Sequence, residues 1–167
     1  MNLSTFLHNR PLYLALFVIC LLLLSYGLVL EHINGIEPCP LCIFQRIAYI
    51  IILVISCVAA IHNPRYPVRQ IYNGALLVTA GIGAGIAMRQ VWLQHLPPDQ
   101  VPECGPGLEY MLEVFPLSEA LQMILSGSGE CAEIHWIFIG LSIAEWSLIW
   151  FMAFMLTLLL AIFYRSG

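Results

Sequence analysis

The sequence predicts an all-α membrane protein, a bundle of four transmembrane helices with both termini on the cytoplasmic side. Of its 167 residues, 60% are hydrophobic and 10% are charged, and the mean hydropathy of +0.88 departs strongly from soluble composition. Four apolar runs approach the roughly 20 residues that cross about 30 Å of hydrocarbon. The chain, 1–167, is therefore predicted to be a single integral membrane domain with spans at about 12–30, 43–61, 71–88 and 147–163.

The first two spans need separate justification. The run at 12–30 has the alternative interpretation of a secretory signal peptide. Its apolar stretch exceeds the usual length of about 7 to 15 residues, and no Ala-x-Ala cleavage site follows, so we expect it to remain as a span. The second run is uncharged only over 47–61 and includes residues 43–46 to reach a sufficient length.

The distribution of arginine predicts the orientation. The chain has no lysine, and the segments before 12, at 62–70 and after 163 share one side and carry Arg10, Arg65, Arg69 and Arg165. Basic residues concentrate on the cytoplasmic side, so these segments are predicted to be cytoplasmic. All ten acidic residues then lie outside. Six scattered arginines do not form a phosphate-binding stripe, which excludes nucleic acid as a partner.

The outer side consists of a short loop at about 31–42 and a long loop at about 92–146, the latter rich in proline and glycine. One piece of the long loop has helical periodicity. Ser118 can cap it, apolar residues repeat at helical spacing, and Gly127 can terminate it. We expect this short amphipathic helix to lie on the membrane surface.

The predicted topology divides the six cysteines into two groups. Cys20 and Cys57 fall within the first and second spans, where an apolar setting makes a thiol inert, so their role is predicted to be structural. The other four lie on the outer side, where disulfides can persist: Cys39, Cys42, Cys104 and Cys131. An even number in two loops favours pairing.

Cys39 and Cys42 form a C-x-x-C pair directly before the second span. A bond that closes so small a ring stabilises little, so redox chemistry explains the pair better than bracing does. If the helix begins near Cys42, its positive end and Arg46, one turn further along the same face, both favour thiolate over thiol. Thiolate is the form that attacks disulfides and electrophiles.

Arg46 and Arg89 each have the alternative interpretation of arginines that reach to lipid phosphates. Arg46 is more informative, because an arginine at the outer edge of a span runs against the distribution of positive charge. In the third span, Gly81 and Gly85 form a small-x-x-x-small pair, which predicts a close helix-packing face.

Cys104 and Cys131 are separated by 26 residues, so a bond between them could contribute about 3 to 4 kcal/mol as a structural disulfide. Glycines beside both cysteines leave the ends free to move, which suits exchange better. Four outer cysteines could also form a zinc site. Structural zinc normally takes two closely spaced pairs, and only one pair here is close, so no metal is predicted.

The cysteine segment resembles the signature of a known family, the bacterial inner-membrane disulfide bond formation protein B (DsbB) family. The likeness covers nearly the whole chain and includes four spans, the second-loop cysteines in their sequence contexts and Trp136 after them. The most specific part is the run Glu37-Pro38-Cys39-Pro40-Leu41-Cys42-Ile43-Phe44-Gln45-Arg46.

This resemblance implies a protein-disulfide:quinone oxidoreductase that reoxidises a DsbA-like periplasmic thiol oxidase and reduces ubiquinone or menaquinone. It implies that a disulfide between Cys104 and Cys131 is attacked by the partner, giving a mixed disulfide at Cys104. Cys39 would then pair transiently with Cys104, and Cys42, activated by Arg46, would contact the quinone. The four cysteines are the implied catalytic residues and Arg46 the implied quinone-binding residue.

Two questions stay open at this level. Some relatives have a histidine just beyond the third span near the quinone, whereas here Gln90 follows Arg89 and the histidine comes later, so His95 is not assigned to the site. The alternative functions are a non-catalytic membrane scaffold whose outer loop is stapled by disulfides, and a paralogue that serves a different soluble oxidase. The C-x-x-C pair favours the enzyme, since a scaffold has no need of an activatable pair at the membrane edge.

Overall fold

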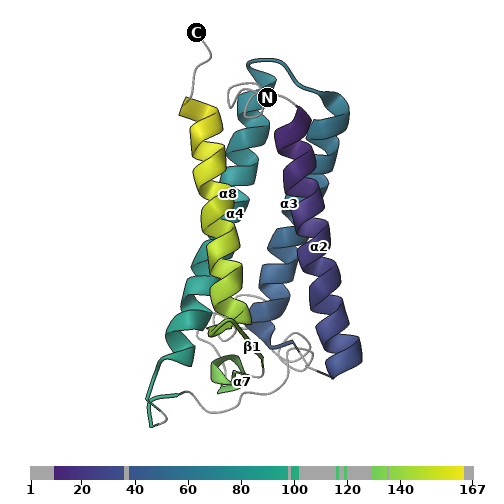
Figure 1. The fold of residues 1–167 in the computed structure, drawn as a ribbon. Helices are drawn as coiled ribbons and strands as arrows, with labels where there is room; N and C mark the ends of the chain where they lie inside the picture. The colour runs from purple at the N-terminus through teal and green to yellow at the C-terminus, as the bar shows by residue number, and fades with distance from the viewer. Residues whose placement is uncertain are drawn as a thin grey trace.

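The computed structural model describes residues 10–35, 38–97, 99–101, 116, 119, 129–134 and 136–163 (Figure 1). Its long helices are α2 (Arg10–Asn34), α3 (Pro40–His62), α4 (Val68–Gln94) and α8 (Ile143–Phe163). These four helices are long and apolar enough to cross a membrane, which confirms the predicted fold class. Each extends beyond its apolar run, because a helix continues through the polar residues at its ends.

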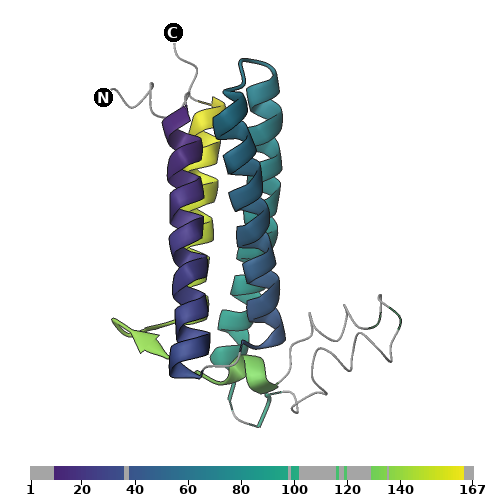
Figure 2. The same cartoon turned by 90° about the vertical axis from the view of Figure 1, so that its right-hand side faces the viewer.

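The helices pack as neighbours in chain order. α2 packs on α3, α3 on α4 and α4 on α8, whereas α2 and α8 have little direct contact in the described part of the chain. The start of α2, the α3–α4 connection and the end of α8 lie at one end of the bundle (Figures 1 and 2). The C-x-x-C pair lies at the opposite end, so the length of the bundle separates Arg10, Arg65 and Arg69 from Cys39 and Cys42.

The outer surface of the bundle is apolar. Leu22, Ile71 and Leu156 are 63%, 70% and 60% exposed, and similar side chains cover the other helix faces. A surface of this kind suits hydrocarbon rather than water. The interior contains many alanines and a few large rings, including Tyr49 of α3 stacked on Phe151 of α8 with their ring centroids 4.3 Å apart.

The glycine that permits close packing is Gly83, not the predicted pair. A Cβ atom at Gly83 would overlap the ring of Phe151, so only glycine lets α8 approach α4 here. Gly81 and Gly85 face open space, and the prediction that they form the packing face was wrong. All three glycines lie in one stretch of α4, and the sequence spacing does not show which of them faces the neighbouring helix.

The ends of α3 are well defined. Cys39 precedes the helix in an extended conformation, and Pro40 occupies its first position, where a missing N–H costs no hydrogen bond. The helix ends at His62 and is capped by Asn63, whose φ of 46° is left-handed. Arg10 of α2 donates from Nε to the carbonyl oxygen of Ala60 at 2.9 Å and so ties the two helices together.

The segment before α8 contains structure that the sequence did not predict. A single helical turn, α7 (Gly129–Ala132), packs against the outer parts of α4 and α3. It is followed by a hairpin of β1 (Ile137–Phe138) and β2 (Leu141–Ser142), whose turn residues Ile139 and Gly140 both have positive φ. The predicted amphipathic helix near 117–127 and Cys104 lie outside the described residues.

Candidate functional site

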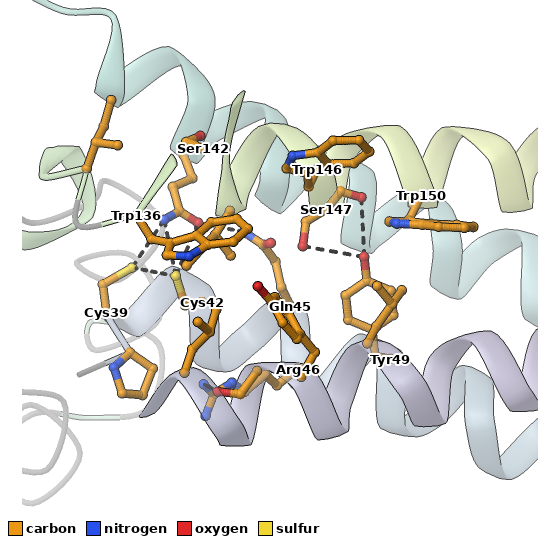
Figure 3. A pocket seen from close by; sticks show the side chains of 18 of the residues that line it. Cys39, Cys42, Gln45, Arg46, Tyr49, Trp136, Ser142, Trp146, Ser147 and Trp150 are labelled. Atoms are coloured by element: carbon orange, nitrogen blue, oxygen red, sulfur yellow. Dashed lines mark hydrogen bonds between the residues drawn. The ribbon is translucent and has the colours of Figure 1, made fainter. Parts of the chain in front are cut away.

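The C-x-x-C pair lies at the start of α3, and its two sulfurs face each other. Both residues are thiols, with Sγ atoms 3.1 Å apart (Figure 3). Cys42 is the third residue of α3, within the turn whose backbone N–H groups have no partner in the helix. Its sulfur therefore lies at the positive end of the helix dipole, as the sequence predicted.

Cys131 of α7 completes a group of three cysteines. It is fully buried and packs in one cluster with Cys39 and Cys42, where Leu41, Ile86 and Leu93 surround the sulfurs. Hydrogen bonding to Cys131 and then to Cys42, together with burial, raises the pKa of the Cys39 thiol well above its ordinary value. The structure thus brings together three of the four predicted catalytic cysteines.

Gln90 of α4 is a residue that the sequence did not suggest. Its amide nitrogen Nε2 lies 3.2 Å from the sulfur of Cys42 and 3.4 Å from the sulfur of Cys39. Its amide oxygen accepts a hydrogen bond of 2.7 Å from Nε2 of Gln45 on α3. Both glutamines are 3% exposed. Two buried amides therefore link α3 and α4 directly beside the thiols.

Arg46 lies near the cysteines but is paired with α2. It forms an ion pair with Glu31 through Nη1, and its Nη2 donates to the carbonyl oxygen of Gly27 at 3.3 Å. The sequence predicted that Arg46 acts on Cys42, one turn away. Among the described residues, the amide that donates to the Cys42 sulfur is instead that of Gln90.

A cavity of about 460 Å³ adjoins the cysteine pair. Cys39, Cys42, Gln45, Arg46 and Tyr49 line one side of it along α3, and three tryptophans lie across from them (Figure 3). The remaining walls come from α2, α4, α7 and α8, including Leu23, Gly27, Leu30, Gln90, Gln94, Glu130 and Ser147. α2 and α8, which both contribute to these walls, have little direct contact with each other in the described part of the chain.

The hairpin covers the outer end of this cavity. Trp136 packs edge-on against Tyr26 of α2 at 5.8 Å and stacks on Phe138 at 5.7 Å. Trp146 of α8 donates from Nε1 to the carbonyl oxygen of Phe138 at 3.1 Å. These contacts connect the hairpin to the ends of α2 and α8, so the aromatic side chains enclose one end of the cavity.

The start of α8 is fixed by a capping box. The side chain of Glu145 accepts from the backbone N–H of Ser142 at 2.7 Å, and Ser142 Oγ accepts from the backbone N–H of Glu145 at 3.3 Å. Ser142 also donates to the side-chain oxygen of Gln94 on α4 at 2.7 Å. The Ser-x-x-Glu spacing is a signal in the sequence that places this helix start ahead of the predicted start of the span at 147.

The cavity has the properties that a quinone ring requires. A quinone is flat and apolar with two carbonyl oxygens, and this site combines aromatic walls with a few polar groups at one end. Arg46 and Gln45 line the end beside Cys42 and carry N–H groups, which suit carbonyl oxygens. The residues present therefore fit a membrane quinone.

The other candidates lie away from this cavity. His95 is largely exposed, with Nδ1 2.8 Å from the carbonyl oxygen of Val91 and Nε2 3.9 Å from Glu145. The guanidinium of Arg89 lies 4.3 Å from the ring centre of Trp92. Cys20 is buried in the interior of the bundle, and neither it nor Cys57 lines the cavity.

Comparison with known proteins gives one consistent family. The family model described as "Disulfide bond formation protein DsbB" matches residues 9–161. "Disulfide bond formation protein B" of Azoarcus sp. (strain BH72) is 52% identical over 158 residues, which cover 95% of each chain. The protein of the same description from Hahella chejuensis (strain KCTC 2396) is 49% identical over 148 residues, 89% of this chain and 90% of that one.

Proposed function

Because the chain belongs to the disulfide bond formation protein B family, we propose that it reoxidises a DsbA-like periplasmic thiol oxidase and passes two electrons to a membrane quinone. Membership establishes a redox role in disulfide bond formation for a multi-pass membrane protein. One observation supports the finer proposal most strongly. Cys39 and Cys42 pack with Cys131 and also line the aromatic cavity. The pair can therefore exchange a disulfide with Cys131 and pass electrons to a molecule bound in the cavity.

The first step takes place in the outer loop. By family resemblance, the partner's thiolate attacks the disulfide between Cys104 and Cys131 at Cys104. A mixed disulfide forms there, and the electron pair of the broken bond leaves on the sulfur of Cys131. The structure describes Cys131 but not Cys104.

The second step transfers the oxidising equivalents of the inner pair to the loop. The Cys131 thiolate attacks Cys39 of the Cys39–Cys42 disulfide, which forms a Cys39–Cys131 bond and leaves the electron pair on Cys42. The contact between Cys131 and Cys39 favours this route. It revises the transient partner of Cys39 that the resemblance implied, which was Cys104.

The last exchanges release the oxidised partner and return the loop to its starting state. The partner's second thiolate attacks the mixed disulfide, which frees Cys104 as a thiolate. Cys104 then attacks Cys131 of the Cys39–Cys131 bond, which restores the loop disulfide and leaves Cys39 and Cys42 reduced. In total the partner's dithiol becomes a disulfide, and two electrons with two protons reside on the inner pair.

The cavity would be the site at which the inner pair is reoxidised. A membrane quinone held there would take up the two electrons and two protons of the Cys39 and Cys42 thiols. Trp146, Trp150 and Tyr49 would hold its ring, and Arg46 with Gln45 would face its polar groups. Since α2 and α8 both line the cavity and have little direct contact in the described part of the chain, a lipid-soluble molecule could enter from the bilayer between them without passage through water.

The distribution of charge supports a periplasmic location for the cysteines. Arg10 begins α2, Arg65 lies in the α3–α4 connection and Arg69 lies in the first turn of α4, all at the end of the bundle remote from Cys39. Basic segments remain in the cytoplasm, so the opposite end would face the periplasm of a bacterial inner membrane.

The test uses purified protein in detergent with a reduced periplasmic dithiol oxidase and soluble ubiquinone and menaquinone analogues. We expect quinone absorbance to fall while the oxidase gains a disulfide in equal amounts. Cys42→Ser and Cys104→Ser should abolish turnover, and Cys20→Ala and Cys57→Ala should leave it nearly intact. Unchanged absorbance with both quinones would contradict the proposal, as would equal loss in all four variants.

A further inference from the structure

Two buried amides lie beside the thiols, and neither takes part in the thiol–disulfide exchanges described above, although both line the cavity. Gln45 and Gln90 come from adjacent helices, and each is 3% exposed. A buried amide is unfavourable unless it is hydrogen-bonded. In an apolar bundle, leucine or alanine would fill the same positions without needing hydrogen bonds. The position of the two amides beside the reacting sulfurs therefore indicates a role in the chemistry of those sulfurs.

The hydrogen bonds give the Gln90 amide a direction. Its oxygen accepts from Nε2 of Gln45 at 2.7 Å and, over a longer distance of 3.6 Å, from the Cys42 thiol. The shorter bond favours the orientation in which the NH₂ group is the nearer group to the Cys42 sulfur. An NH₂ group has two donors. One sulfur, that of Cys42, lies 3.2 Å from the nitrogen, and the other, that of Cys39, lies 3.4 Å away. Both distances suit an N–H donor to sulfur.

The direction of the amide matters for the charge that appears on Cys42. When the Cys131 sulfur bonds to Cys39, the Cys39–Cys42 bond breaks and its electron pair stays on Cys42. A thiolate in a buried setting is stabilised by hydrogen-bond donors. The neighbouring arginine, Arg46, already pairs with Glu31. The Cys39 thiol donates to the Cys42 sulfur in the reduced protein, but Cys39 has no S–H while it is bonded to Cys131. Among the described residues, the amide of Gln90 is then the side-chain donor placed to meet the new charge.

We infer that Gln90 is a catalytic residue that donates a hydrogen bond to the Cys42 thiolate, and that Gln45 is the positioning residue that keeps this donor turned toward the sulfur. The inference rests on the proposed function for the exchange step in which the Cys42 thiolate forms. The hydrogen bond to that thiolate does not depend on the proposed function, because Cys42 also ionises in the reduced protein. A better stabilised Cys42 thiolate is a better leaving group in the exchange and persists longer beside the cavity.

The experiment measures the alkylation rate of Cys42 in the reduced full-length protein, in detergent and without oxygen, with iodoacetamide as a small neutral probe. Mass spectrometry of the peptide that contains Cys42 gives the rate. We expect Gln90→Met to lower the rate at pH about 7 by about tenfold, since a hydrogen bond to a charged group is lost. Gln45→Met should lower it by about threefold, because the donor remains but is free to turn.

Two comparisons separate this role from a structural one. Gln70→Met makes the same substitution about 30 Å along α4, outside the site, and should leave the rate of Cys42 alkylation unchanged. A full pH profile should show that the Gln90→Met rate approaches the unsubstituted rate at high pH, since the thiol is then ionised in both proteins. A purely steric change would lower the rate equally at every pH.

The outcomes are distinct from those of the quinone assay, because no quinone and no partner protein is present. A tenfold loss that disappears at high pH supports the inference even if quinone turnover fails. An unchanged rate in Gln90→Met, or an equal loss at every pH, overturns the inference even if the unsubstituted protein reduces quinone.

Discussion

The ion pair between Glu31 and Arg46 links α2 to the proposed quinone site, and removing it should weaken quinone binding. Arg46 lines the cavity, and its guanidinium is held by the carboxylate of Glu31 on the neighbouring helix. Glu31→Gln keeps the size of the side chain and removes its charge. Arg46 would then lose its charge partner and sample other directions, so the quinone site would be less well preorganised.

The size of the effect follows from exposure. The side chains of Arg46 and Glu31 are 28% and 31% exposed, which is too open for the large energies of fully buried pairs. Exposed pairs contribute about 0.2 to 1 kcal/mol, and we take the upper end because the pair is partly shielded. About 1 kcal/mol corresponds to about a fivefold change in affinity. We therefore expect the KM for quinone to rise about fivefold.

The assay is quinone reduction at saturating reduced oxidase, with kcat and KM determined separately. Asp99→Asn removes one charge from an exposed outer position away from the cavity and serves as the control. Combining Glu31→Gln with Arg46→Met should add little to the loss caused by Arg46→Met alone, because the two residues act together. An unchanged KM in Glu31→Gln, or a fully additive double variant, would refute the reasoning.

Three further predictions concern packing, the exchange route and pH. Gly83→Ala should lower the stability of the bundle by about 1 to 3 kcal/mol in thermal unfolding, whereas Gly81→Ala, which faces open space, should change it by less than about 0.5 kcal/mol; equal effects would contradict the packing described. Cys131→Ser should stop oxidation of the partner, while the chemically reduced variant should still reduce one equivalent of quinone. Stopped-flow absorbance measures this reduction, and oxidation of the partner by the variant, or no reduction of quinone, would contradict the exchange route. In reduced protein at pH about 7, alkylation should modify Cys42 at least about tenfold faster than Cys39. The raised pKa keeps the Cys39 thiol neutral until the pH is well above neutral. Equal rates in peptide mass spectrometry would contradict this prediction.

The sequence predicted the parts of the molecule that depend on composition and local spacing. Apolar runs of sufficient length located all four long helices, because burying twenty apolar residues in lipid outweighs other preferences. The start of the second helix, expected near Cys42, lies two residues earlier at Pro40, which suits the first position of a helix. Cys42 lies in the first turn of α3, which agrees with the expectation that it adjoins the second span.

The parts that depend on side-chain direction were not predictable in this way. Arg46 is one turn from Cys42, yet its side chain points to α2 because the opposite charge of Glu31 lies there. Gln45 and Gln90 are 45 positions apart and meet only when α3 packs on α4. The hairpin has strands of only two residues, which are too short for an alternating pattern to show.

The contact between Cys39 and Cys131 is the feature on which the electron route depends, and it can be measured without turnover. In the Cys42→Ser, Cys104→Ser double variant, these two cysteines are the remaining thiols of the outer side. Mild oxidation followed by peptide mapping without reductant should recover Cys39 linked to Cys131 in nearly all molecules. Recovery of both as separately alkylated thiols would contradict the route.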